Sequence, residues 1–167
     1  MKYFPYFLVF IFFCVGINKE ILAQQDTLGL TEQKIMEIYT VENQNLEIFY
    51  KKHSIPKPMK KALKIKYGDV FCFSIANSGK NYRKNDVIKN PFIPSKQMLF
   101  LIRSGEYYAL VFNKGGKGHS THFVFCRIIS KEIVEMKIYY IFKSDTVEDF
   151  LSEIQNQKFR PVKWLNE

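Results

Sequence analysis

Hydrophobic and polar residues follow a strand-like pattern over much of the second half of the chain. Short connections that contain Gly, Ser, Lys or Glu separate four such segments, which are Gln97–Arg103, Tyr107–Asn113, His119–Ile129 and Ile133–Phe142. An earlier segment, Val70–Ala76, has the same character and is followed by a polar, turn-rich stretch. Alternation with a period of two is typical of β-strands, and short connections favour antiparallel neighbours. These segments predict an antiparallel meander of about five strands.

Two helices are predicted in the first half of the chain. Apolar residues recur near helical spacing behind Thr31, a residue type that is favoured as an N-cap, so we expect a helix over Thr31–Tyr50. Asn43 and Asn45 weaken the centre of this helix because asparagine has a low helix propensity. A short helix is also expected from Pro58 to Lys66, since proline is tolerated in the first turn.

A second long helix is predicted near the C-terminus, with Ser144 or Asp145 as its cap. Its apolar residues have i, i+3, i+4, i+7 spacing and are Val147, Phe150, Leu151 and Ile154. Residues 158–167 form a tail with apolar side chains that can dock on the sheet. The sequence therefore predicts an α+β fold, in which an N-terminal and a C-terminal helix pack on the antiparallel meander.

The N-terminal segment has the pattern of a signal peptide. Lys2 precedes an eleven-residue apolar run, Phe7–Ile17, which is shorter than the ~20 residues of a membrane-spanning helix. Ala23 is small enough for a cleavage position, although Ile21 two residues before it is not ideal. We expect residues 1–23 to be a cleaved signal peptide and residues 24–167 a single exported domain with no transmembrane segment. Retention as an uncleaved anchor is the alternative.

Composition and charge narrow the class of protein. The chain has 167 residues, 47% of them hydrophobic, which excludes a disordered polymer and a collagen-like repeat. Three cysteines are too few for a disulfide-stabilised miniprotein. After signal cleavage Cys72 and Cys126 remain. In an oxidising compartment they either form a disulfide or stay buried as two free thiols.

Charge is concentrated in one window of this basic chain. Its formal net charge is +9, and no acidic residue lies between Ile48 and Gly68. Four lysines of this window are candidate binding residues: Lys57, Lys60, Lys61 and Lys64. Lysine-rich segments attract anionic lipid surfaces and acidic proteins, whereas many such segments are only solvated loops. An exported protein is not expected to meet nucleic acid.

Aromatic residues on neighbouring strands are the second candidate surface. Phe123 and Phe125 lie on the same side of one predicted strand, with Tyr107 and Tyr139 on its neighbours. If exposed, they would form a binding patch. If the N-terminal helix covers them, they belong to the core, and large exposed apolar patches are rare.

His119 and His122 are the only residues that suggest catalysis or metal binding. Cys126 lies four residues after His122, about 13 Å along a regular strand, so the two cannot bind one ion unless a bulge intervenes. No Walker-type loop, G-x-S-x-G or H-E-x-x-H motif is present. We therefore expect neither a metal nor a cofactor.

Together these features predict a small exported basic domain, periplasmic or secreted, that acts as a non-catalytic binding or interaction module. Its expected partner is an acidic protein or an anionic surface of the cell envelope. The alternative is a small hydrolase or metal-binding enzyme that uses the region of His119 and His122. The sequence leaves the ligand and the oligomeric state open.

Overall fold

The computed structural model describes residues 31–40, 43, 45–69, 73–85, 92–116, 118–142 and 144–162. The segment predicted to be a signal peptide lies outside these residues. The chain forms two compact units, one up to Glu37 and one from Ile38 onwards. In the first unit, residues 31–37 are described and are helical. None of the described helices is long and apolar enough to cross a membrane.

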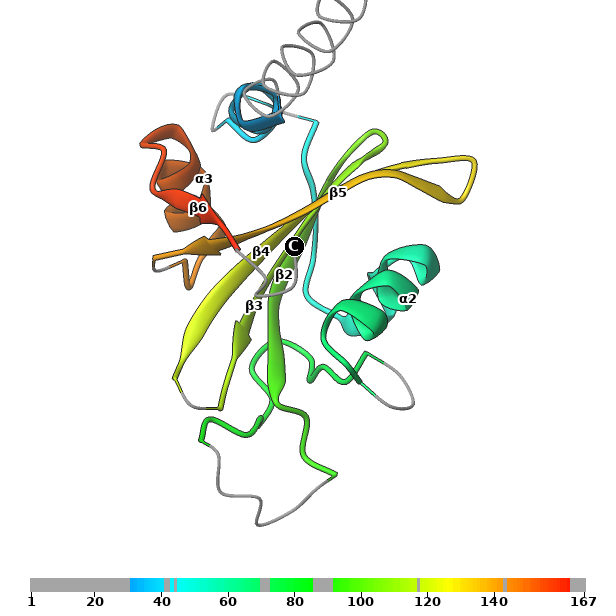
Figure 1. Cartoon of the computed structure of the whole chain (residues 1–167). Helices are drawn as coiled ribbons and strands as arrows, with labels where there is room; N and C mark the ends of the chain where they lie inside the picture. Colours follow the sequence, from blue (N-terminus) through cyan, green and yellow to red (C-terminus); the bar gives the residue numbers. More distant parts are fainter. Residues whose placement is uncertain are drawn as a thin grey trace, which may run out of the picture. The chain divides into compact units, whose positions relative to one another are not determined.

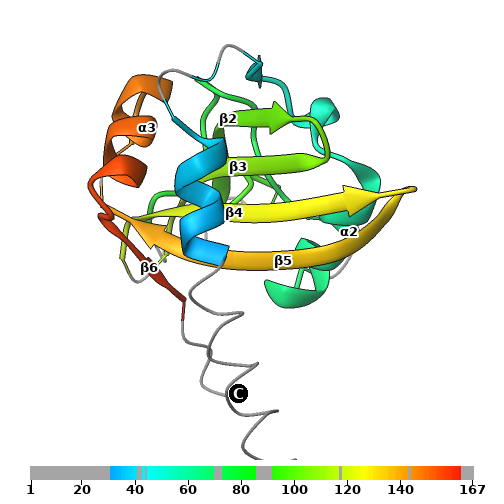
Figure 2. The ribbon, with the colours of Figure 1, turned by 90° about the horizontal axis from the view of Figure 1, so that it is seen from above.

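The second unit is built on a six-stranded antiparallel sheet whose strands follow one another in sequence order (Figures 1 and 2). The strands are β1 (Glu47–Phe49), β2 (Lys96–Ser104), β3 (Tyr107–Lys114), β4 (Ser120–Ile129), β5 (Glu132–Ile141) and β6 (Phe159–Pro161). The helices are η1 (Lys52–Ser54), α2 (Lys57–Lys66) and α3 (Val147–Gln155). The predicted α+β fold with an antiparallel meander is therefore confirmed, and each of the four long strands lies within one residue of its predicted bounds.

The predicted helix over Thr31–Tyr50 is too long. Helical backbone ends at residue 38, and residues 47–49 form β1, in which Phe49 pairs with Leu101 of β2. Asn43 explains the end of the helix, because its side-chain nitrogen donates to the carbonyl of Ile38 at 2.7 Å. Its side-chain oxygen accepts from the backbone N–H of Asn45 at 3.0 Å. Asparagine thus offers the backbone local partners that compete with helical hydrogen bonds.

Two further differences concern short segments. Within the predicted strand Val70–Ala76, the described residues 73–75 are not in a strand, and Ala76 forms only an isolated parallel bridge with Gln97. The predicted C-terminal tail contributes the edge strand β6, whose Phe159 pairs with Ile141. Such short edge strands are defined by the long strand beside them rather than by their own pattern.

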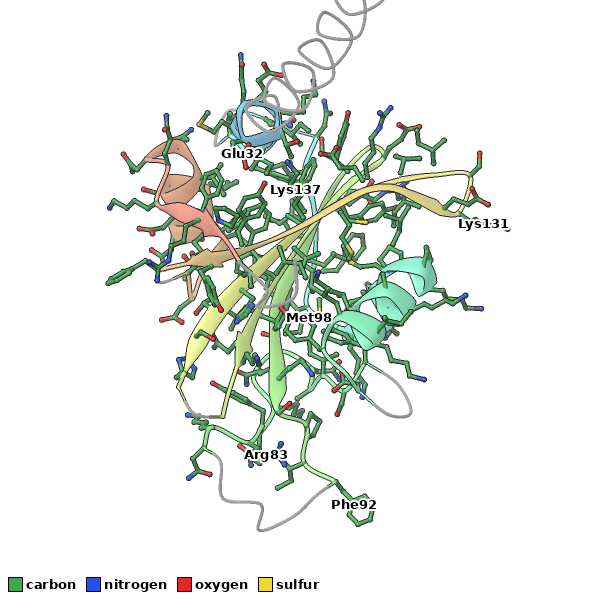
Figure 3. All side chains as sticks on the ribbon, in the orientation of Figure 1. Glu32, Arg83, Phe92, Met98, Lys131 and Lys137 are labelled. Carbon is green, nitrogen blue, oxygen red and sulfur yellow. The ribbon has the colours of Figure 1, made fainter. Side chains whose placement is uncertain are left out.

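Helix α2 covers one face of the sheet (Figure 1). It begins behind Pro56, with Pro58 in its first turn, and places Met59 and Leu63 against the sheet. Both side chains are fully buried in a cluster with residues of β2, β3, β4 and β5. In Figure 3, Met98 of β2 is labelled between the sheet and this helix.

Helix α3 covers the opposite face of the sheet. All four predicted apolar positions of this helix are buried. Its N-cap is Thr146, whose hydroxyl accepts from the N–H of Asp149 at 3.1 Å, rather than Ser144 or Asp145. The ring of Phe150 lies edge-on to Phe123 of β4 at 5.2 Å between centroids. The sheet is therefore buried on both faces in its central part.

Candidate functional site

The four lysines singled out in the sequence lie on one side of α2. Their positions are i, i+3, i+4 and i+7, so they form one stripe along the helix. Met59 and Leu63 point the other way, into the core. Lys57 and Lys61 are exposed, and Lys60 and Lys64 are half-buried. We call Lys57, Lys60, Lys61 and Lys64 the lysine face.

Positive charge on the lysine face is not neutralised by the surrounding described residues. Among those residues, none of the four side chains has a carboxylate within ion-pair distance. Lys60 has a carbonyl partner instead, because its Nζ donates to His53 at 3.5 Å. Partial burial lowers the pKa of Lys60, and the neighbouring charges of Lys52 and Lys57 lower it further. An anion at this face would relieve that repulsion.

A groove lies beside the lysine face. It has a volume of about 730 Å³ and separates the N-terminal half of α2 from the β4–β5 hairpin. Lys57 and Lys61 line it from the helix, and Lys131 lines it from the hairpin turn. Figure 3 labels Lys131 at the far end of that hairpin. Tyr108 and Ile128 also line the groove, and both pack against the core cluster below α2.

The aromatic candidates are not on the surface. Phe123 and Phe125 are both fully buried, so of the two alternatives the exposed binding patch is not formed. Phe123 lies between Phe150 of α3 and Tyr139 of β5, and Phe125 contacts Tyr39. The covered alternative is therefore the correct one, with α3 and Tyr39 among the residues that cover this face.

A buried ion pair lies at one end of the sheet, on the side of α2. Nζ of Lys96 in β2 donates to the two carboxylate oxygens of Asp69 at 2.9 and 3.0 Å. The Lys96 side chain is 3% exposed, and the same ammonium lies 5.1 Å from the ring centroid of Tyr67. Burial lowers the pKa of Lys96, and Asp69 offsets this effect only in part. The lysine is thus held by one acid and by aromatic faces.

His122 of β4 lies next to this pair and is almost completely buried. Its Nδ1 is 2.9 Å from the hydroxyl of Tyr67, and its Nε2 is 2.9 Å from the hydroxyl of Ser120. Burial lowers the pKa of His122 to about 4, with Lys114 and Lys96 adding to the effect. The ring is therefore neutral at pH 7, and a neutral imidazole donates at one nitrogen and accepts at the other.

The Ser120–His122 pair resembles a nucleophile and its base, but the surroundings do not suit hydrolysis. In a Ser-His-Asp triad, a carboxylate orients the histidine and stabilises the imidazolium that forms during catalysis. Here the third group is the hydroxyl of Tyr67, and burial raises the pKa of that hydroxyl, so it stays neutral. Lys96 and Lys114 further disfavour an imidazolium. This geometry fits a hydrogen-bonded core histidine.

Where the structure describes them, the remaining candidates do not assemble into a reactive centre. His119 is hydrogen-bonded to the Tyr82 hydroxyl at 2.5 Å and lines a second groove with Ser120. Over the described part of the chain, no three His, Cys, Asp or Glu side chains could hold a metal ion together. Cys126 is a buried free thiol, and burial raises its pKa to about 12. This agrees with the alternative of buried free thiols for Cys126, and its proposed partner Cys72 lies outside the described residues.

The sequence contained little sign of the Lys96–Asp69 pair. Lys96 precedes a predicted strand and Asp69 follows a helix, both of which are ordinary positions for solvated charges. Lys131 likewise lies in a predicted turn, where a solvated lysine is ordinary. Only the register that places β2 and the hairpin beside α2 brings these residues to their sites.

Comparison of the chain with protein-family models, curated protein sequences and solved structures finds no match. The function must therefore be inferred from the described residues themselves.

Proposed function

We propose that this chain is a non-catalytic binding module that attaches to an anionic surface of the cell envelope through the lysine face of α2. In this proposal the protein is exported, and it acts in the periplasm or after secretion. The observation that carries the proposal is the stripe of Lys57, Lys60, Lys61 and Lys64 on the outer side of one helix, with no carboxylate partner among the described residues.

Residue type and neighbours favour a lipid surface over a site that recognises one particular acid. Lysine acts as a flexible point charge, whereas arginine suits bidentate recognition of a carboxylate or phosphate. Ile65 lies in the same helix and is 73% exposed. An exposed aliphatic residue beside lysines is suited to the boundary between lipid headgroups and acyl chains. An acidic protein partner is the competing class.

The expected strength is moderate and depends on salt. A lysine close to an anionic lipid surface contributes about 1 kcal/mol, so four contribute about 4 kcal/mol at low ionic strength. The Debye length falls from about 10 Å at 0.1 M salt to about 3 Å at 1 M. High salt should therefore remove most of the attraction.

The test is co-sedimentation of the mature chain with vesicles. Vesicles that contain phosphatidylglycerol should retain the protein at 0.1 M salt and release it at 1 M. Pure phosphatidylcholine vesicles should retain little at either concentration. Equal binding to both lipids would contradict the proposal, and binding to soluble polyglutamate but not to vesicles would indicate an acidic protein partner instead.

A further inference from the structure

The groove between α2 and the β4–β5 hairpin combines positive charge with an apolar floor. Its two walls belong to different elements, with Lys57 and Lys61 on α2 and Lys131 on the hairpin turn. Lys57, Lys61 and Lys131 are all exposed. Among the described residues, none of the three has a carboxylate at ion-pair distance. A single anionic group in this groove would thus meet ammonium groups from two sides.

The apolar part of the groove is contributed by the sheet. Tyr108 of β3 and Ile128 of β4 are half-buried and belong to the rim of the core cluster. The guanidinium of Arg103 lies 5.8 Å from the ring centroid of Tyr108, a cation–π contact that helps to hold the ring in place. Pro56 and Pro58 complete the lining at the start of the helix. These surfaces suit an alkyl or aryl group and offer few partners to a second charge.

From this juxtaposition we propose that the groove binds one molecule of an amphiphilic acid. Its phosphate or carboxylate contacts Lys57, Lys61 and Lys131, and its apolar body packs on Tyr108 and Ile128. The volume of about 730 Å³ lies in the range of small-molecule sites, about 300–1,000 Å³. The occupant is the free amphiphile and not a bilayer, because the cationic side chains come from both walls.

This site goes beyond the lysine face and is separable from it. Lys57 and Lys61 belong to both surfaces, whereas Lys131 belongs only to the groove, and Lys60 and Lys64 belong only to the lysine face. Single substitutions therefore distinguish binding of a free amphiphile from attachment to an anionic surface.

The first experiment compares three probes by isothermal titration calorimetry with the mature chain, below the concentration at which the probes form micelles. Decyl phosphate should bind at least about tenfold more tightly than inorganic phosphate, because each buried methylene contributes about fourfold. Decyltrimethylammonium, which has the same tail and the opposite charge, should not bind. Equal affinities for decyl phosphate and inorganic phosphate would overturn the proposal.

The second experiment uses variants that leave the core unchanged. Lys131→Asn removes one charge and introduces a residue that tolerates the left-handed backbone at this turn, where φ is 69°. It should weaken decyl phosphate binding about tenfold, the usual loss for a hydrogen bond to a charged group. Lys64→Gln is the matched control and should change the affinity less than twofold. An unchanged affinity in Lys131→Asn would contradict the groove assignment.

Vesicles separate this proposal from the proposed function. Salt-sensitive binding to phosphatidylglycerol vesicles without binding of monomeric decyl phosphate would reject the groove site and leave the lysine face intact. Binding of decyl phosphate without attachment to vesicles would reject the surface function and support the groove.

Discussion

Lysine is used in two opposite ways on the two sides of α2. Below the C-terminal end of this helix, Lys96 is buried, doubly hydrogen-bonded to Asp69 and enclosed by aromatic rings. On the outer side, the four residues of the lysine face are exposed or half-buried and have no acidic partner among the described residues. Lysine is therefore a core residue at position 96, whereas on the lysine face it is available to a binding partner.

This difference shows which charges stabilise the fold and which do not. A buried charge is expensive unless it is paired, so losing its partner has a large effect on stability. Charges of one sign on an exposed helix face repel one another and contribute nothing to folding. Charges that do not stabilise the fold serve either solubility or binding. The following predictions test the contrast between the two kinds of lysine.

The largest expected effect concerns the buried pair. Asp69→Asn leaves the ammonium of Lys96 without its counter-ion, and we expect the free energy of unfolding to fall by about 3–5 kcal/mol. Urea unfolding followed by circular dichroism measures this change. The double variant Lys96→Met/Asp69→Asn is the control, because removing both charges should recover part of the loss. A loss below about 1 kcal/mol in the single variant would contradict the assigned role.

The next effect concerns pH and His122. The pKa of His122 in the folded chain is about 4, below the ordinary value of 6.5. Between pH 4 and pH 6.5, His122 is therefore protonated in the unfolded chain and neutral in the folded chain. Stability from this group is complete above pH 6.5 and decreases as the pH falls towards 4. The difference of about 2.5 pKa units corresponds to roughly 3 kcal/mol.

Urea unfolding at pH 7.5 and pH 4.5 measures this dependence. The wild-type chain should lose more stability between the two values than His122→Gln, which has no titrating ring at this position. Parallel losses in the two proteins would show that His122 does not resist protonation.

The smallest expected effect on stability concerns the lysine face. Replacing all four lysines by Ala should change the free energy of unfolding by less than about 0.5 kcal/mol, since exposed substitutions away from special features are nearly neutral. Relief of repulsion around Lys60 favours a small gain in stability. Thermal unfolding is a sufficient measurement, and a substantial loss would mean that these side chains support the fold.

Much of the architecture follows from local sequence pattern. The long strands β2, β3, β4 and β5 and the helix α3 have strong periodicity, and the structure places all of them close to their predicted bounds. The short strands β1 and β6 could not be found in this way, because three residues carry no period and their pairing depends on a distant neighbour.

In the candidate site, too, local features are visible in the sequence and long-range contacts are not. The i, i+3, i+4, i+7 spacing of the lysine face is local and visible in the sequence once a helix is assumed. By contrast, the contact of Lys96 with Asp69 joins residues 27 positions apart. Likewise, the burial of Phe123 depends on α3, which lies later in the chain. Contacts of this kind follow from tertiary structure and not from residue spacing.

The most direct test of the central claim is a charge reversal with a matched control. Lys60→Glu/Lys64→Glu changes the lysine face, and Lys80→Glu/Lys84→Glu makes the same change in net charge at exposed lysines elsewhere. Binding of both variants to phosphatidylglycerol vesicles is measured at 0.1 M salt. The account predicts that the first variant loses binding while the second keeps most of it. Equal losses in both would show that only net charge matters and would contradict a binding role for α2.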